Sequence, residues 1–142
     1  MNQVIWMITY SSETRISLDQ FIQILKDSTL GERRPITDLE RMKRMLENAD
    51  ILITAWDDKI LVGVSRAVSD FAYCTYVSDL AVHEQYQRLG IGKQLLNETR
   101  KKSGGRGTFL LLAAPKAHNY YPHIGFKLSD RCFFLSEDTK LF

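Results

Sequence analysis

The stretch Gln87-Arg88-Leu89-Gly90-Ile91-Gly92-Lys93 decides how this chain folds, because its two glycines lie between a β-type run and an amphipathic helix. The run from Tyr73 to Val82 is rich in β-branched and aromatic residues, which is typical of a strand. From Ile91 to Arg100 the apolar residues recur at helical spacing. Free N–H groups and the helix dipole attract anions at a helix N-terminus, and glycine lets an anion come close. The stretch therefore predicts a strand-to-helix junction that binds phosphate.

The spacing excludes two other phosphate-binding patterns. A dinucleotide-binding fingerprint requires a third glycine three residues after the second, where this chain has Leu95. A P-loop requires a glycine five residues before the Gly-Lys pair and Ser or Thr after it, and those positions hold Gln87 and Gln94. What remains is a Gln/Arg-x-x-Gly-x-Gly/Ala pattern, which arises by chance roughly 0.15 times in a chain of this length. Alone, this pattern is weak evidence.

A second motif follows the apolar run from Thr108 to Ala114, and it has the form Tyr121-x-x-x-Gly125-Phe126. This spacing arises by chance in only about one such chain in a hundred. Together and in this order, the two motifs resemble those of the GCN5-related N-acetyltransferases. The first is similar to their acetyl-coenzyme A pyrophosphate loop, and the second to their "Phe-Tyr-x-x-x-Gly-Phe" segment. The resemblance extends from about Ile51 to Leu128.

The resemblance implies a fold class. We expect an α/β protein with a GNAT-like acyl-CoA N-acyltransferase fold, in which a central mixed, mostly antiparallel sheet is flanked by helices and splays open between strands 4 and 5. Residues 1–142 are expected to form a single N-acetyltransferase domain.

The periodicity predicts the elements in more detail. We expect one helix that begins after a Ser17 cap and ends near Asp27, and a second that begins at a Thr37 capping box. A third, short helix is expected around 117–123. The expected strands are 4–10, 51–56, 60–67, 73–82, a parallel strand at 108–114, and a closing strand near 132–135.

The resemblance also implies an activity, the transfer of an acetyl group from the thioester of acetyl-CoA to a primary amine by direct attack in a ternary complex. In the family, main-chain groups of the pyrophosphate loop and of the strand before it hold the cofactor. On this chain the cofactor-binding residues would be Leu80, Ala81, Val82, Gln87, Arg88, Leu89, Gly90, Ile91, Gly92, Lys93 and Asn119. Ordinary core packing of Leu80 and Val82 is compatible with this role, and Asn119 is as well explained by a helix cap.

Tyr121 is the candidate general acid that protonates the departing thiolate, and aromatic packing is the competing interpretation. The family register, four residues before Gly125, selects it over Tyr120. Asp79 is the candidate general base, because the family often has a carboxylate near this end of the strand. The alternative bases are Glu84, His118 and His123. Ordered water could also take the place of a side-chain base.

Composition bounds the remaining function classes. The chain has 142 residues with 44% apolar content and a net charge of +2, which is typical of one globular domain without the basic surface of a nucleic-acid binder. No apolar run approaches the ~18 residues of a membrane span, so we expect a cytoplasmic protein. Cys74 and Cys132 lack metal-ligand spacing, so we expect no metal and buried, reduced thiols. The basic residues 100–102 are expected to complement a helix C-terminus.

Two alternatives to an enzyme are open. The first is a non-catalytic acyl-CoA-binding sensor module, and the second is a nucleic-acid or protein interaction domain, which the small net charge disfavours. The partners implied by the resemblance are acetyl-CoA and an amine acceptor, either a small molecule or a protein amine. The identity of the acceptor, the acyl-chain preference and the formation of a homodimer stay open.

Overall fold

The fold was analysed in a computed structural model, which describes residues 7–142 of the chain. The chain divides into two compact units, Met1–Leu112 and Ala113–Phe142, and each is described by itself. Whether they act as the single domain predicted from the sequence stays a prediction.

The first unit contains a five-stranded mixed sheet with the strand order β1-β2-β3-β4-β5. Its strands are β1 (Ile8–Ser11), β2 (Ile51–Asp57), β3 (Ile60–Ser69), β4 (Cys74–Val82) and β5 (Thr108–Leu111). The first four pair antiparallel, whereas β5 pairs parallel to β4. The predicted fold class is confirmed.

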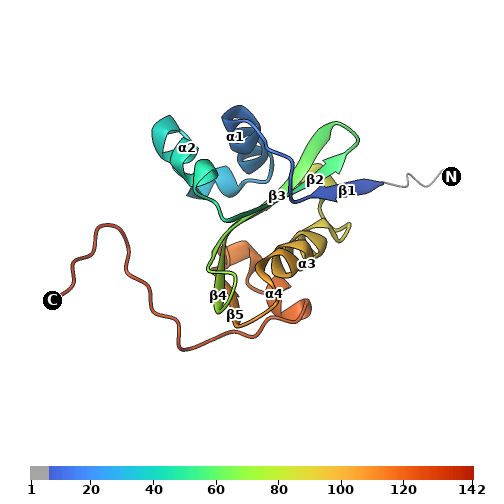
Figure 1. The fold of residues 1–142 in the computed structure, drawn as a ribbon. Helices are drawn as coiled ribbons and strands as arrows, with labels where there is room; N and C mark the ends of the chain where they lie inside the picture. The colour runs from blue at the N-terminus through green and yellow to red at the C-terminus, as the bar shows by residue number, and fades with distance from the viewer. Residues whose placement is uncertain (1–6) are drawn as a thin grey trace. The chain divides into compact units, whose positions relative to one another are not determined.

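Helices cover both faces of this sheet (Figure 1). They are α1 (Leu18–Asp27) and α2 (Leu39–Glu47) on one face and α3 (Ile91–Ser103) on the other. Two short 3₁₀ helices, η1 (Leu30–Arg33) and η2 (Glu84–Tyr86), lie in the connections. In the second unit, η3 (Pro115–Ala117) precedes the short helix α4 (Tyr120–His123).

Apolar periodicity explains the helix faces. The α1 side chains of Phe21, Ile24 and Leu25 are buried with Met42 of α2 against Val64 of the sheet. Burying each such side chain stabilises the fold by about 1.5 to 3 kcal/mol relative to leaving it exposed. The apolar residues of α1 and α2 therefore hold this layer on the sheet.

On the opposite face, α3 approaches β3 closely at Gly63. A Cβ added to Gly63 would lie 3.0 Å from Leu95 Cδ1 and 3.3 Å from Ile91 Cγ2. The glycine in β3 therefore lets α3 pack directly on the sheet, which fixes where this helix begins.

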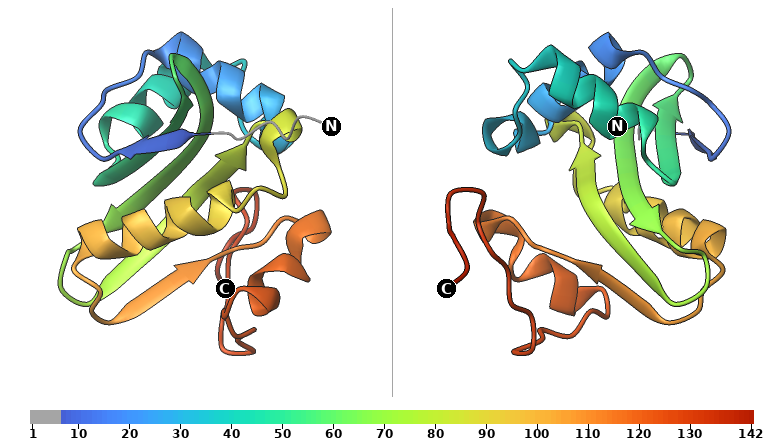
Figure 2. Two further views of the ribbon diagram at one scale, coloured as in Figure 1. Left: turned by 90° about the vertical axis from the view of Figure 1, so that its right-hand side faces the viewer. Right: turned by 60° about the vertical axis from the view of Figure 1, so that its left-hand side comes forward.

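The sheet splays at β4. Only residues 74–77 of β4 pair with β5, so the remainder of β4, from Ser78 to Val82, has a neighbouring strand only on the β3 side. Figure 2 shows the two strands side by side at their start and then separating. We call Ser78–Val82 the one-sided segment of β4.

Helix caps were predicted with mixed success. Ser17 caps α1 in a capping box with Gln20, as expected. The predicted Thr37 cap is wrong, because the N-cap of α2 is the next residue, Asp38, whose carboxylate accepts a hydrogen bond from the N–H of Arg41. Asp and Thr both cap helices well, so the sequence leaves the choice between neighbours open.

The ends of β2, β3 and β4 differ from the predicted ones by one or two residues, and three other strands differ more. Residues 4–6 of the predicted first strand lie outside the described residues, and β1 occupies 8–11. The predicted strand at 108–114 ends at Leu111. The closing strand predicted at 132–135 is wrong: these residues form no strand, and the side chains of Phe133 and Phe134 are exposed. Their apolar, β-type composition suggested a strand, but no described strand pairs with them.

Cys74 and Cys132 are free thiols, as expected, but both are exposed rather than buried. No helix among the described residues has the length and apolar content needed to cross a membrane.

Candidate active site

The predicted phosphate loop leads from η2 into α3. The N–H of Gln94 donates to the carbonyl of Gly90, which is the first helical hydrogen bond, so the helix makes no use of the N–H groups at positions 91–93. Arg88 and Gly90 both adopt left-handed backbone conformations, with φ of 66° and 81°. Such conformations next to a helix N-terminus turn successive N–H groups toward one anion. A Cβ added to Gly90 would meet nothing within 4 Å, so this backbone is open to a ligand.

Side chains on both sides of the loop fix its position. The buried Tyr86 donates its hydroxyl to Asp57 Oδ2 over 2.7 Å, which ties η2 to the end of β2. This hydrogen bond to Asp57 raises the pKa of Tyr86. The Gln87 amide donates to the carbonyl of Val82 over 3.0 Å. The side chain of Gln87 therefore braces the loop against β4, and its main chain stays the candidate for cofactor binding.

The one-sided segment of β4 carries the other predicted cofactor residues. The N–H of His83 donates to the carbonyl of Val62 in β3. Because main-chain groups alternate along a strand, those of Ala81 also face β3, whereas those of Leu80 and Val82 face the edge that β5 leaves. The side chain of Ala81 is buried in the core. Of the three predicted residues, Leu80 and Val82 thus have the geometry for strand-like hydrogen bonds to a ligand.

Asp79, the candidate base, lies between two arginines. Its side chain is 0% exposed, and Oδ1 and Oδ2 accept hydrogen bonds from Arg34 Nε and Arg66 Nε, each over 2.5 Å. A carboxylate so paired has no exposed oxygen to offer an amine. This arrangement supports a structural role for Asp79 and gives the base proposal no support. Of the alternative bases, Glu84, His118 and His123 are exposed.

Sequence reasoning missed the two arginine partners of Asp79. One signal was available for Arg66, which stands in a strand whose neighbouring residues are apolar or small, so that a buried guanidinium there requires a charged partner. Arg34 gave no such signal, because it lies in a polar connection between two helices.

The second unit carries the Tyr121 motif. The Tyr121 ring packs edge-on against Tyr120 and Phe126, at centroid distances of 5.3 and 5.5 Å. Burial, with a smaller effect from Tyr120, raises the pKa of Tyr121 to about 12. The N–H of Phe126 donates to the carbonyl of Tyr121, and Gly125 adopts a left-handed φ of 113°, so this part of the motif closes a turn. The phenol therefore stays protonated through the neutral range.

Asn119 directly precedes α4 and is exposed. Its side chain makes no capping hydrogen bond, so the structure does not support the helix-cap interpretation. A role in cofactor binding stays a prediction.

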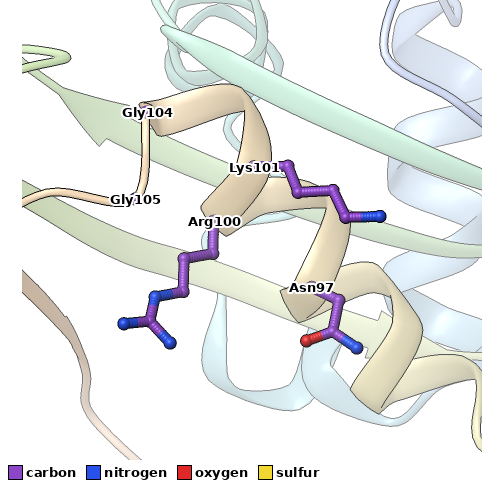
Figure 3. A pocket seen from close by; sticks show the side chains of 5 residues that line it. All are labelled: Asn97, Arg100, Lys101, Gly104 and Gly105. Atoms are coloured by element: carbon purple, nitrogen blue, oxygen red, sulfur yellow. The ribbon is translucent and has the colours of Figure 1, made fainter.

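The basic residues at the end of α3 line a shallow pocket of about 420 Å³ (Figure 3). Its lining consists of Asn97, Arg100, Lys101, Gly104 and Gly105. Lys101 pairs with Glu98 and Lys102 with Glu13, while Gly104 ends the helix in a left-handed conformation. These contacts agree with the predicted role of the cluster at the negative end of the helix dipole.

Comparison with known proteins places the chain in a family. A family model described as an acetyltransferase (GNAT) domain matches residues 26–134. An uncharacterized N-acetyltransferase ycf52 of Pyropia yezoensis is 32% identical over 127 residues, which cover 84% of this chain and 70% of the relative. The ycf52 protein of Gracilaria tenuistipitata var. liui is 30% identical over 74% of this chain, which spans 59% of the length of that relative.

A solved structure supports the fold. An aminoglycoside N-acetyltransferase AAC(6')-Iy in complex with CoA superimposes with a TM-score of 0.72 at 14% identity, covering 98% of this chain and 100% of the other. At this identity the likeness concerns the fold alone. The family match over most of the chain and the 32% identical relative lead to one conclusion: this chain belongs to the acetyltransferase (GNAT) family.

Proposed function

We propose that the protein transfers the acetyl group of acetyl-CoA to a primary amine by direct attack in a ternary complex. One observation carries the proposal: the one-sided segment of β4 is followed, after η2, by a loop whose N–H groups at positions 91–93 the helix leaves unused, and the Gln87 side chain ties this loop to Val82. A pantetheine arm needs strand-like partners, and a pyrophosphate needs convergent N–H donors. This junction offers both on adjoining backbone.

The residues present fit acetyl-CoA. Main-chain donors from Arg88 to Lys93 would hold the pyrophosphate at the N-terminus of α3, and the Lys93 side chain adds a positive charge. The main chain of Leu80 and Val82 would bind the pantetheine arm. An N–H donor there would also polarise the thioester carbonyl, which is oxyanion-type stabilisation. The aminoglycoside N-acetyltransferase of similar fold was solved with CoA, which supports this assignment.

The proton balance gives Tyr121 its role in the proposal. A neutral amine attacks the thioester carbon, a C–N bond forms, the C–S bond breaks, and the proton that nitrogen loses ends on sulfur. A phenol with a pKa of about 12 carries its proton at neutral pH. Transfer of that proton to a thiolate, whose conjugate acid has a pKa of about 8.5, is uphill and requires the two groups to be held together with water excluded. The phenolate is then reprotonated at the expense of the nitrogen. No side chain is assigned as base, because both oxygens of Asp79 are engaged by arginines.

A second candidate function is a non-catalytic acyl-CoA sensor. It is favoured by the pairing of both Asp79 oxygens with arginines, which leaves the site without an assigned base. Such a module would bind acetyl-CoA through the same loop and would need neither a base nor Tyr121. The two candidates differ in turnover and agree in cofactor binding.

Calorimetry with acetyl-CoA, followed by thiol release in the presence of amines, separates the two. The acceptor panel contains an aminoglycoside, because of the relative of similar fold, together with spermidine, a lysine-containing peptide and a peptide with a free α-amino group. We expect binding and amine-dependent thiol release, with the acetylated amine identified by mass spectrometry. Binding without release for every amine would favour the sensor, and absence of binding would contradict both candidates.

A further inference from the structure

Ser78 marks the place where β4 loses its pairing with β5 and bulges out of its register with β3. The register with β3 passes from the Arg66–Asp79 pair to the Ala67–Val77 pair, so a bulge leaves Ser78 without a partner residue there. The pairing with β5 ends at Val77. Ser78 therefore opens the one-sided segment without a ladder partner on either side.

Two arginines bind Ser78 in place of the missing ladder. Arg34 Nη2 donates to the Ser78 carbonyl over 2.7 Å, and Arg66 Nη2 donates to the Ser78 hydroxyl over 2.9 Å. The same two guanidinium groups hold the adjacent carboxylate of Asp79. The bulge is thus fixed by side chains that come from outside β4.

Arg34 binds Ser78 and Asp79 from a part of the chain that is distant in sequence. It follows η1 in the connection between α1 and α2, and its side chain is 22% exposed. Its Nη1 donates to the carbonyl of Arg33 over 2.9 Å, so all three of its nitrogens are used, each on a different acceptor. A planar guanidinium can satisfy three acceptors in fixed directions, whereas an ammonium cannot reproduce that geometry.

We propose that Arg34 is a positioning residue for acetyl transfer: through Ser78 and Asp79 it fixes the one-sided segment of β4 in the orientation that polarises the thioester. The inference rests on the proposed function, because the donors it aligns are those of Leu80 and Val82. Stabilisation of a developing oxyanion depends on donors that are already in place, so loosening the bulge weakens the transition state more than the ground state.

Charge explains why Arg34 can be tested without unfolding the protein. Arg34, Arg66 and Asp79 together carry a net charge of +1, from two guanidinium groups and one carboxylate. Removing Arg34 leaves the neutral pair of Arg66 with Asp79, and no buried charge loses its last partner. We therefore expect Arg34→Gln to fold.

The experiment compares Arg34→Gln with Arg33→Gln, a matched control that changes the exposed arginine one residue earlier. Calorimetry with acetyl-CoA gives the affinity and the fraction of competent protein, and thiol release with the most active amine of the panel gives kcat and KM. For Arg34→Gln we expect kcat per competent site to fall about tenfold or more, while KM for acetyl-CoA changes less than about threefold. Arg33→Gln should stay within about twofold of the unchanged protein in both.

A second variant and a second measurement test the geometry. Arg34→Lys keeps the charge but loses the fork, so its kcat should fall like that of Arg34→Gln. Amide hydrogen exchange in peptides that cover residues 78–82 should be faster in Arg34→Gln than in the unchanged protein. In Arg33→Gln the same peptides should exchange at the unchanged rate. This measurement needs no acceptor, so it decides the structural step even in a protein that binds acetyl-CoA without turning it over.

Failure of this inference differs from failure of the proposed function. If the unchanged protein acetylates no amine, the proposed function fails. If the protein is active and Arg34→Gln matches Arg33→Gln in kcat, or Arg34→Lys restores full activity, the positioning role is wrong. Unchanged exchange of residues 78–82 in Arg34→Gln would also overturn it.

Discussion

Gly92 lies in the first turn of α3, where its main-chain N–H is among those that the helix does not use. Replacing it with valine should obstruct a pyrophosphate and remove one or two charge-assisted hydrogen bonds, each worth roughly 1.5 to 3 kcal/mol. We expect Gly92→Val to bind acetyl-CoA at least about tenfold more weakly by calorimetry. Gly92→Ala, as a smaller change, should weaken binding less. Unchanged affinity in a folded Gly92→Val protein would contradict the phosphate-loop assignment.

Tyr121 and Tyr120 are neighbours whose rings touch, which makes them a matched pair. Tyr121→Phe removes one hydroxyl and keeps the ring, so cofactor affinity should stay nearly intact while kcat falls about 10²-fold, at the low end for general acid catalysis. Tyr120→Phe should lower kcat far less. Equal rates for the two variants in the thiol-release assay would remove the acid role from Tyr121.

Asp79 should prove important for stability. Asp79→Asn leaves the guanidinium groups of Arg34 and Arg66 without their shared carboxylate, and breaking a buried ion pair in this way typically costs about 3 to 5 kcal/mol. We expect a loss of this size in the free energy of unfolding, measured by urea denaturation. Asp130→Asn changes an exposed carboxylate and should have little effect. Wild-type stability in Asp79→Asn would show that the two arginines do not depend on it.

Single residues were predictable where the reason is local. Gly90 and Gly92 follow from the short-range geometry of a strand-to-helix junction, and the structure has them at the start of α3. Asp79 became the candidate base through the family resemblance, and its arginine partners were missed because they are remote: Arg34 lies 45 residues away and Arg66 13 residues away. Which charged side chains form ion pairs over such sequence separations depends on how α2 and β3 pack. A local sequence pattern carries no information about that packing.

Among the elements, α2 gives a direct test of a cap. Asp38 accepts the N–H of Arg41 over 3.2 Å, whereas Thr37 lies one residue outside the helix. Asp38→Ala should therefore lower the free energy of unfolding by about 1 kcal/mol, and Thr37→Ala should change it much less. Thermal and urea denaturation of the two variants would check this. A larger loss in Thr37→Ala would place the helix start where the sequence predicted it.

Elements with a strong period were predictable, and those that need a partner were not. The apolar stripe of α1 and the β-type run of β4 specify their own conformation, and both are confirmed. The run Cys132-Phe133-Phe134-Leu135 has similar composition but forms no strand. A strand is stable only beside another strand, and composition alone does not supply that neighbour.

For the whole molecule, the pH dependence of turnover follows from the acceptor and from Tyr121. If the acceptor is an alkylamine with a pKa near 10, its neutral fraction rises about tenfold per pH unit below that value. Because the pKa of Tyr121 is raised to about 12, this acid keeps its proton over the same range and adds no falling limb. We expect kcat/KM to rise about tenfold per unit from about pH 6 to about pH 9.

The alternative profiles are informative. A rise that levels off near about pH 7 to 8 would report an enzyme group acting as base, and His118→Ala should then shift that break. A rate independent of pH, with chemistry shown to limit the rate, would point to an acceptor other than a basic amine.

The one-sided segment of β4 also carries a risk of aggregation. An unpaired strand edge attracts other extended chains, and proteins usually block such edges with charge or with covering side chains. Here the guanidinium of Arg34 donates a hydrogen bond to the carbonyl of Ser78 at one end, and the side-chain amide of Gln87 donates one to the carbonyl of Val82 at the other. The backbone between them is short, which leaves a second strand few main-chain groups to pair with. If this segment binds the thioester arm as proposed, the same two side chains would leave room for that ligand while discouraging association of the protein with itself through this edge.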